Sequence, residues 1–414
     1  MAAKRQNIDL LIGIAIGLAF SASTISLVNR FTSWLGRRKE EDIVDGVPGL
    51  IGNTPLLRIK SLSDALGVDI LGKAEFLNPG GSVKDRVAMK IIDDAEASGY
   101  LKPGIGSRIF EGTVGSTGIS IATLAAARGY NTTIIMPDDV AAEKALALRA
   151  LGADVEKVRP ASIVDKKQFV NLAKSKAAAY GTNARSLPGL DGVVSSDQDL
   201  DAKDQPRGFF ADQFENRSNF EAHYQGTGPE IWRQSGCKVD AFVSGAGTGG
   251  TIAGAGQYLR EKNPKIIVVL SDPEGSGLYN KVKHGVMFDA KESEGRKRRH
   301  QVDTVVEGIG INRLTKNFEY ALPIIDDAIR VSDVEAVSMS RFIVKNDACN
   351  LVAAVKVAKR LPRSGRVVTI LCDSGSRHYS KFWNDEYLEA AGIRVDISLT
   401  EDLLKQNTIQ STSK

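Results

Sequence analysis

The sequence predicts an α/β protein with two open α/β domains, preceded by an N-terminal transmembrane helix. Three observations support this prediction. Short apolar segments alternate with segments of helical character, glycine-rich turns follow two of the apolar segments, and residues 10–28 contain no charged side chain. The chain has 414 residues, of which 42% are hydrophobic, enough to cover parallel sheets with packed helices.

Residues 10–28 form the first predicted element, an apolar helix long enough to cross a bilayer. Basic residues flank it, with Lys4 and Arg5 before it and further arginines after it. A cleaved signal peptide is the alternative, but the apolar core is longer than such peptides usually have. We expect residues 1–40 to be an uncleaved anchor and basic linker. The basic flanks favour the mitochondrial outer membrane with the rest of the chain in the cytosol, and the endoplasmic reticulum is the alternative.

Lys84 is the first candidate for chemistry, because it ends a glycine-rich turn where a helix can begin. An apolar strand is predicted over residues 70–77, and residues 87–92 have helical spacing. The helix dipole and partial burial both lower the pKa of an amine in this position. Such lysines form Schiff bases with carbonyl compounds. The alternative is a solvated lysine on the first turn of a helix.

A second glycine-rich turn at residues 247–251 follows the predicted strand Val239 to Val243 and precedes a helical segment. Its backbone N–H groups and the helix N-terminus can together bind an anion, although such turns also occur as plain loops. A lysine that binds an aldehyde and a turn that binds a phosphate indicate pyridoxal 5'-phosphate as the cofactor.

Eight short motifs occur in one order along the chain. They are residues 51–56 (IGNTPL), 81–86 (GSVKDR), 111–118 (EGTVGSTG), 213–216 (QFEN), 223–224 with 227–232 (HY and TGPEIW), 244–254 (SGAGTGGTIAG), 307–310 (EGIG) and 372–374 (CDS). In this order they resemble the cysteine synthases and cystathionine β-synthases, pyridoxal-phosphate enzymes of fold type II, from about Val47 to about Ala391. The resemblance implies a fold like that of the tryptophan synthase β subunit, with the cofactor between the two domains.

The resemblance also implies roles for individual residues. Lys84 would bind the cofactor covalently and move the proton at the substrate α-carbon, and Ser374 would contact the pyridine nitrogen. Ser116 stands where the family has an asparagine that contacts the cofactor's 3' hydroxyl. The phosphate would be bound by Gly247, Thr248, Gly249, Gly250 and Thr251. The substrate carboxylate would be bound by Thr113, Gly115, Thr117 and Gln213.

The activity implied is that of a cysteine synthase, in which sulfide replaces the acetate of O-acetylserine. A cystathionine β-synthase-like condensation of serine with homocysteine is one alternative, and a cofactor-binding scaffold with little activity is another. The resemblance also implies a homodimer. We expect the catalytic region over residues 41–400, with a smaller domain at about 85–219, a larger domain formed by 41–84 and 220–400, and a polar tail at 401–414.

Three features depart from the family pattern. Val114 and Ser116 replace the usual serine and asparagine of the substrate loop. A segment near Ala348 is shorter than usual, and residues 184–208 form an apparent insertion that we expect to be a long exposed loop. These departures leave open a tolerated variant, a changed substrate or a weakened enzyme.

Composition argues against other classes of site. The three cysteines are scattered, so they predict neither disulfides nor a zinc cluster, and the four histidines have no metal-ligand spacing. The net charge is +4, and the basic residues are interspersed with acidic ones, so nucleic-acid binding is not expected.

Overall fold

The computed structural model describes residues 43–138, 140, 142–181, 205–289, 304–343, 348–375 and 378–405. The chain divides into two compact units, residues 1–50 and residues 51–414. Within the first unit, the structure describes a short 3₁₀ turn, η1 (Pro48–Leu50). The predicted anchor at residues 10–28 lies outside the described residues, as does most of the apparent insertion. No helix in the described part of the chain has the length and apolar character needed to cross a membrane.

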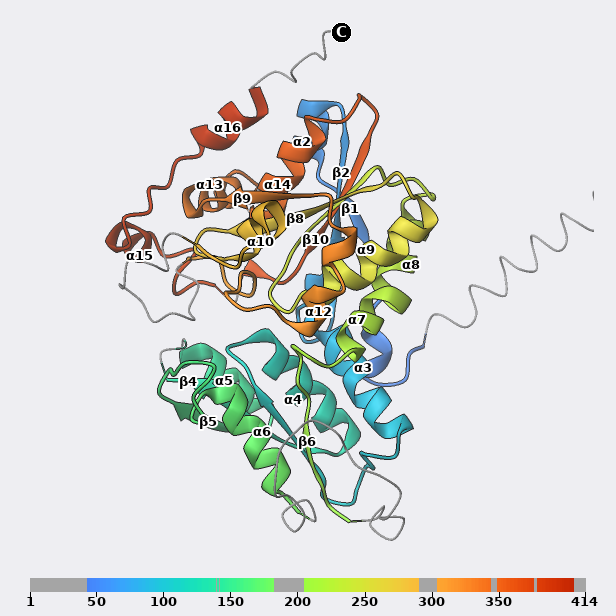
Figure 1. The fold of residues 1–414 in the computed structure, drawn as a ribbon, viewed down its shortest axis with the longest axis vertical. Helices are drawn as coiled ribbons and strands as arrows, with labels where there is room; N and C mark the ends of the chain where they lie inside the picture. The colour runs from blue at the N-terminus through green and yellow to red at the C-terminus, as the bar shows by residue number, and fades with distance from the viewer. Residues whose placement is uncertain are drawn as a thin grey trace, which may run out of the picture. The chain divides into compact units, whose positions relative to one another are not determined.

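The larger sheet of the second unit has six strands among the described residues, in the order β1-β2-β10-β7-β8-β9 (Figure 1). Only the first pair is antiparallel, and the other neighbours run parallel. Its strands are β1 (Leu56–Arg58), β2 (Asp69–Ala74), β7 (Ala241–Gly245), β8 (Ile267–Pro273), β9 (Asp327–Val331) and β10 (Arg366–Leu371). We call this the large sheet.

The large sheet is buried on both faces, as parallel sheets usually are. Neighbouring residues of one strand belong to different apolar clusters; Ile70 packs with one and Leu71 with the other. Helices α13 (Asp333–Ile343) and α14 (Ala348–Ala358) contribute to the first cluster. Helix α9 (Gly250–Lys262) contributes to the second. Helices therefore cover the sheet on both sides.

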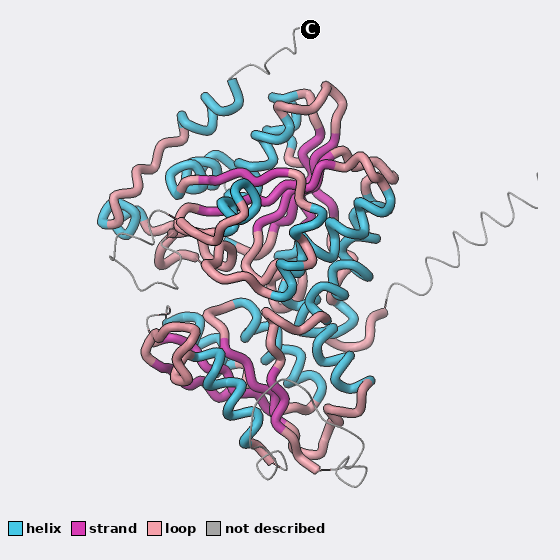
Figure 2. The backbone as a smooth tube through the Cα atoms, in the orientation of Figure 1, coloured by secondary structure: helices cyan, strands magenta, loops and turns pink. Residues whose placement is uncertain are grey.

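The described part of the second unit also contains a four-stranded parallel sheet in the order β5-β4-β3-β6, which we call the small sheet. Its strands are β3 (Arg108–Gly112), β4 (Asn131–Pro137), β5 (Asp154–Val158) and β6 (Gly208–Phe210). The helices that pack with its apolar residues are α3 (Lys84–Ala97), α4 (Ser116–Arg128), α5 (Ala142–Ala150) and α6 (Phe169–Ala179). Figure 2 shows both sheets in magenta among these helices.

The remaining described elements lie between strands or after the last strand in the chain. They are α2 (Lys60–Leu66), η2 (Glu75–Leu77), α7 (Ser218–Ala222), η5 (His223–Thr227), α8 (Gly228–Gln234), α10 (Leu278–His284), α12 (Lys316–Glu319), η6 (Leu322–Ile324), α15 (Asp385–Ala390) and α16 (Ser398–Lys405).

The predicted α/β class is confirmed, but one predicted strand is too long. The strand expected over residues 70–77 ends at Ala74, and residues 75–77 form the 3₁₀ turn η2. The cause is local hydrogen bonding. The Glu75 carbonyl accepts from the backbone and the side chain of Asn78, which curls the chain before the glycine-rich turn.

Candidate active site

Three turns that carry predicted site residues follow three adjacent parallel strands of the large sheet. The Lys84 turn follows β2, Ser374 follows β10, and the Gly247 turn follows β7. Strand β10 lies between β2 and β7 and runs parallel to both. The carboxyl ends of parallel strands meet at one edge, which is where ligands bind in open α/β sheets. The topology therefore places these three segments side by side.

Lys84 is the first residue of helix α3, and hydrogen bonds fix the turn before it. The Val83 N–H donates to the carbonyl of Cys372 at 2.8 Å, and Ser82 forms an antiparallel bridge with Asp373. Burial lowers the pKa of Lys84, partly offset by Cys372 and Asp373. The direction expected from the sequence is confirmed, and a lowered pKa favours the neutral, nucleophilic amine.

The residue after Lys84 ties the turn to the small sheet. The Asp85 carboxylate accepts hydrogen bonds of 2.5 Å from the Gly80 N–H and from the hydroxyl of Ser120. Ser120 lies in α4, the helix that follows the predicted substrate loop. Asp85 thus connects the lysine turn to the element that carries the substrate loop.

The turn at residues 247–251 has donors available for an anion. Among the described residues, none accepts a hydrogen bond from the backbone N–H groups of Gly247, Thr248 or Gly249. Gly249 has φ +89°, and a Cβ there would lie 2.6 Å from the backbone of Phe318, so only glycine fits. The turn also leads into the 13-residue helix α9. Free N–H donors at a helix N-terminus fit the phosphate of pyridoxal phosphate.

The predicted substrate loop lies between β3 and α4 on the small sheet. Thr113, Gly115 and Thr117 are buried, and the Gly115 N–H donates to the Thr113 hydroxyl at 3.4 Å. The Thr117 hydroxyl donates to the side-chain carbonyl of Gln213 at 2.5 Å. Val114 is 46% exposed. The structure therefore brings Thr117 and Gln213 together, although they lie far apart in sequence.

A buried asparagine, Asn219, joins Gln213 to the turn at residues 247–251, which we call the phosphate turn after its predicted role. The Asn219 side-chain amide donates to the backbone carbonyl of Gln213 and to the hydroxyl of Thr248, each at 2.8 Å. The two groups of predicted site residues therefore belong to one hydrogen-bonded assembly. The structure places the two other predicted cofactor residues as follows. Ser116 is the first residue of α4, and Ser374 directly follows Asp373, which bridges to Ser82.

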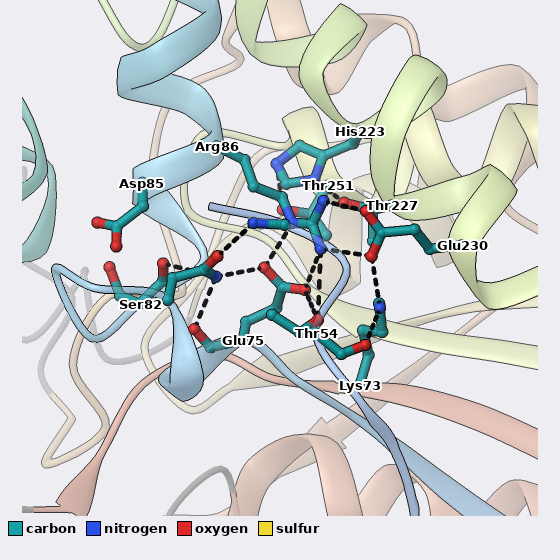
Figure 3. A network of polar contacts seen from close by, with 12 residues as sticks. Thr54, Lys73, Glu75, Ser82, Asp85, Arg86, His223, Thr227, Glu230 and Thr251 are labelled. Atoms are coloured by element: carbon teal, nitrogen blue, oxygen red, sulfur yellow. Dashed lines mark hydrogen bonds and ion pairs between the residues drawn. The ribbon is translucent and has the colours of Figure 1, made fainter. Parts of the chain in front are cut away.

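A buried ion network beside the lysine turn was missed by sequence reasoning (Figure 3). The Arg86 guanidinium bonds Glu75 and Glu230, and the Lys73 ammonium lies 2.6 Å from Glu230. Lys73 and Glu75 are fully buried. Burial alone would lower the pKa of Arg86, but the two carboxylates raise it. The same contacts hold the pKa of Glu230 at about 2 despite burial. The sequence does contain a signal for this network. Lys73 and Glu75 lie in or just after an apolar strand, and buried charges need partners.

A second unforeseen cluster surrounds Glu307, which lies in one of the eight motifs. Lys144 of α5 bonds its carboxylate, Lys381 lies 3.2 Å from it, and the His378 ring lies 3.4 Å from it. The other ring nitrogen of His378 lies 3.1 Å from Asp373. The cluster joins a small-sheet helix to the segment that follows β10.

We expect the stability of the protein to fall between about pH 6.5 and pH 9 because of His378. Burial alone would lower the pKa of His378, but Asp373 and Glu307 raise it from 6.5 to about 9. The charged form therefore stabilises the fold fully below pH 6.5, and this stabilisation is lost as the pH rises through 9. The shift corresponds to at most about 3 kcal/mol.

Chemical denaturation at a series of pH values would measure this effect. The His378→Gln variant should show a flatter profile over the interval, and His284→Gln, at an exposed histidine, should follow the unmodified protein. If the His378→Gln and unmodified profiles have the same slope, the expectation is wrong.

A lysine with a lowered pKa at a helix start, beside a turn with free N–H donors at the edge of a parallel sheet, is typical of one class of protein, the pyridoxal-phosphate-dependent enzymes. The comparisons agree. Residues 47–373 match the family model described as "Pyridoxal-phosphate dependent enzyme". The chain belongs to this family, within the branch of the cysteine synthases and cystathionine β-synthases.

Two relatives and one solved structure illustrate the similarity. "Cysteine synthase 2" of Schizosaccharomyces pombe is 51% identical, covering 98% of this chain and 100% of the relative. The "Putative mitochondrial cysteine synthase" of Saccharomyces cerevisiae is 49% identical, covering 86% and 87%. An O-acetylserine-dependent cystathionine β-synthase from Helicobacter pylori is 30% identical, with a TM-score of 0.64, covering 82% of this chain and 98% of that structure. The chain thus has neighbours of fold type II and depends on pyridoxal phosphate.

Proposed function

We propose that this chain is a cysteine synthase that replaces the acetate of O-acetyl-L-serine with sulfide to form L-cysteine. The observation that carries the proposal is the 51% identity with a cysteine synthase through nearly the whole length of both chains. The geometry supports it, because the lysine turn, the anion-binding turn and the substrate loop form one connected assembly.

In this proposal Lys84 carries the cofactor and later acts as a base. When bound, the cofactor withdraws electrons from the α-carbon of the amino acid substrate. The Lys84 amine, released when the substrate binds, takes the α-proton, and its lowered pKa favours the neutral form that this step requires.

The other residues bind and orient. Thr113, Gly115, Thr117 and Gln213 would hold the substrate carboxylate through the loop after β3. Gly247, Thr248, Gly249, Gly250 and Thr251 would hold the cofactor phosphate. Ser374 would contact the pyridine nitrogen, and Ser116 the 3' hydroxyl.

A cystathionine β-synthase reaction is the second candidate, favoured by one observation. The solved structure from Helicobacter pylori is described as an O-acetylserine-dependent cystathionine β-synthase. The two reactions then differ in the attacking sulfur nucleophile, which is homocysteine in one and sulfide in the other. Ser116 in the substrate loop and the shortened segment near Ala348 motivate a third candidate, a cofactor-binding scaffold with little turnover.

One assay separates these candidates. The full-length protein, saturated with pyridoxal phosphate, is given O-acetylserine with sulfide, O-acetylserine with homocysteine, or serine with homocysteine. We expect cysteine from the first mixture at the highest kcat/KM. Faster formation of cystathionine would favour the second candidate, and bound cofactor without product would favour the scaffold.

The remaining parts of the proposal concern assembly and location. We propose a smaller domain at about 85–219, a larger one from 41–84 and 220–400, and a homodimer. Light scattering of the purified protein would test the dimer.

We also propose that residues 10–28 anchor the chain in the mitochondrial outer membrane, supported by the apolar sequence and by the mitochondrial name of the yeast relative.

We expect the full chain to remain in the membrane pellet after alkaline extraction, and a chain without residues 1–40 to be released, because about twenty apolar residues can span a bilayer. Protease added to intact mitochondria should then digest the catalytic region. Release of the full chain by alkali would refute the anchor, and recovery in microsomes would indicate the endoplasmic reticulum.

A further inference from the structure

A buried histidine connects two threonine hydroxyls, one of which belongs to the phosphate turn (Figure 3). The Nδ1 atom of His223 lies 2.9 Å from the Thr227 hydroxyl, and its Nε2 atom lies 3.1 Å from the Thr251 hydroxyl. His223 and Thr227 are fully buried. Thr251 is in the first turn of α9, directly after the free N–H donors of the phosphate turn.

The local backbone is built to hold this arrangement. His223 begins a π-helical turn, η5, in which the Gly228 N–H donates to the His223 carbonyl five residues earlier. Single π turns of this kind are frequent at functional sites. The turn packs tightly on α9 at Gly254, where a Cβ would lie 2.3 Å from the Phe220 carbonyl and 2.9 Å from the Cβ of His223. Glycine at this position therefore lets the imidazole reach Thr251.

The imidazole is neutral in this environment. Burial lowers the pKa of His223 well below its usual value. The nearby positive charges of Arg86 and Lys84 lower it further, while Glu230 acts in the opposite direction. A neutral imidazole has one N–H donor and one acceptor nitrogen, so it presents a different group to each of the two hydroxyls.

Only two arrangements of the protons satisfy both contacts. In the first, the Thr227 hydroxyl donates to Nδ1, the Nε2–H donates to Thr251, and the Thr251 hydroxyl keeps its proton for another acceptor. In the second, Nδ1–H donates to Thr227 and Thr251 donates to Nε2, so that Thr251 turns oxygen lone pairs toward the phosphate turn. An anion in that turn favours the first arrangement, because it needs a donor there.

We propose that His223, as the Nε2–H tautomer, is a positioning residue that keeps the Thr251 hydroxyl oriented as a donor to the cofactor phosphate. The inference rests on the proposed phosphate role of residues 247–251. The proposal assigns a role to a residue that acts on the phosphate only through Thr251. It also states which group donates in each of the two hydrogen bonds, Thr227 to His223 and His223 to Thr251.

The phosphate dependence of this role gives a sharp test. We would measure the affinity of the full-length apoprotein for pyridoxal phosphate and for pyridoxal, which lacks the phosphate. For His223→Leu we expect pyridoxal phosphate to bind about 10- to 100-fold more weakly, the size of one hydrogen bond to a charged group, with little change for pyridoxal. For His223→Gln, which retains an N–H donor, we expect a smaller loss.

Equal weakening of both compounds by His223→Leu would show that the residue only supports the fold, and would overturn the proposal. A double-mutant comparison adds a second criterion. In a protein that already carries Thr251→Val, the further change His223→Leu should alter the affinity for pyridoxal phosphate by less than about twofold. The reason is that the hydroxyl that His223 orients is then absent. Additive losses would contradict the inference.

Nitrogen-15 NMR of the histidine-labelled, unsubstituted holoenzyme tests the tautomer directly, even if the variants fail to fold. The four histidines are few enough to assign by comparison with His223→Gln, or by the solvent protection of a buried ring. We expect a protonated Nε2 and an unprotonated Nδ1, and the reverse pattern would overturn the proposal. These readouts need no turnover, so they can fail while cysteine synthase activity is present, or succeed while it is absent.

Discussion

The Lys84→Ala variant should lose cysteine formation by at least about 10³-fold, because it removes both the covalent attachment of the cofactor and the base that takes the α-proton. The structure leaves little room for a substitute. The turn before Lys84 is fixed by the bond from the Val83 N–H to the Cys372 carbonyl, while Lys73, a fully buried lysine, is held by Glu230 and the Thr54 carbonyl. Turnover would be measured together with the absorption spectrum and with borohydride trapping of the cofactor.

Lys90→Ala provides the matched control, because Lys90 lies on the same helix and, among the residues that the structure describes, its ion pair is with the partly exposed Asp94. We expect this variant to keep the absorption band, the trapped adduct and nearly full turnover. Cysteine formation by Lys84→Ala at the unmodified rate, or a trapped adduct on another lysine in the unmodified protein, would refute the assignment of Lys84.

Loss of Glu230 should give the largest effect on stability, about 3–5 kcal/mol in the free energy of unfolding for Glu230→Ala. The reason is that Glu230 neutralises two buried cations at once, Arg86 and Lys73. Without it, Lys73 keeps the side-chain carbonyl of Gln234 and the Thr54 carbonyl, but no carboxylate in the described part of the chain lies within hydrogen-bond distance. Urea or guanidinium denaturation of the holoenzyme would measure the change.

Glu221→Ala is the control, since Glu221 pairs with the exposed Arg217 on the protein surface and should cost at most about 1 kcal/mol. The pH dependence offers a second check. The pKa of Glu230 is about 2 in the fold against 4.5 for a free side chain, so its stabilisation is present above pH 4.5 and lost as the pH falls toward 2. Equal losses in both variants would show that the network contributes no more than a surface pair.

The parts of the site that could be predicted are those encoded by local sequence. The Lys84 turn and the Gly247 turn each combine a strand, glycines and a helix within about twenty residues, and the structure has both where the sequence places them. The lowered pKa of Lys84 followed from the same local reasoning. The substrate loop needed the collinear family motifs, because small polar residues have no pattern of their own.

The ion pairs could not be predicted, because their partners lie far apart along the chain. Arg86 meets Glu230 144 residues later, and Lys144 meets Glu307 163 residues later. Nothing in the sequence around either residue identifies its partner. The overlong strand predicted for residues 70–77 has a different, local cause, because the Glu75 carbonyl accepts from the backbone and the side chain of Asn78.

The position of β10 between β2 and β7 has a consequence for how the protein is made. The ribosome synthesises β2 roughly three hundred residues before β10. Strand β10 can therefore pair with β2 and β7 only when most of the chain has been made. Until then the Lys84 turn lacks the Cys372 and Asp373 backbone that anchors it. We therefore expect pyridoxal phosphate to bind only when synthesis of the chain is nearly complete. Chains that terminate before residue 371 should not bind it.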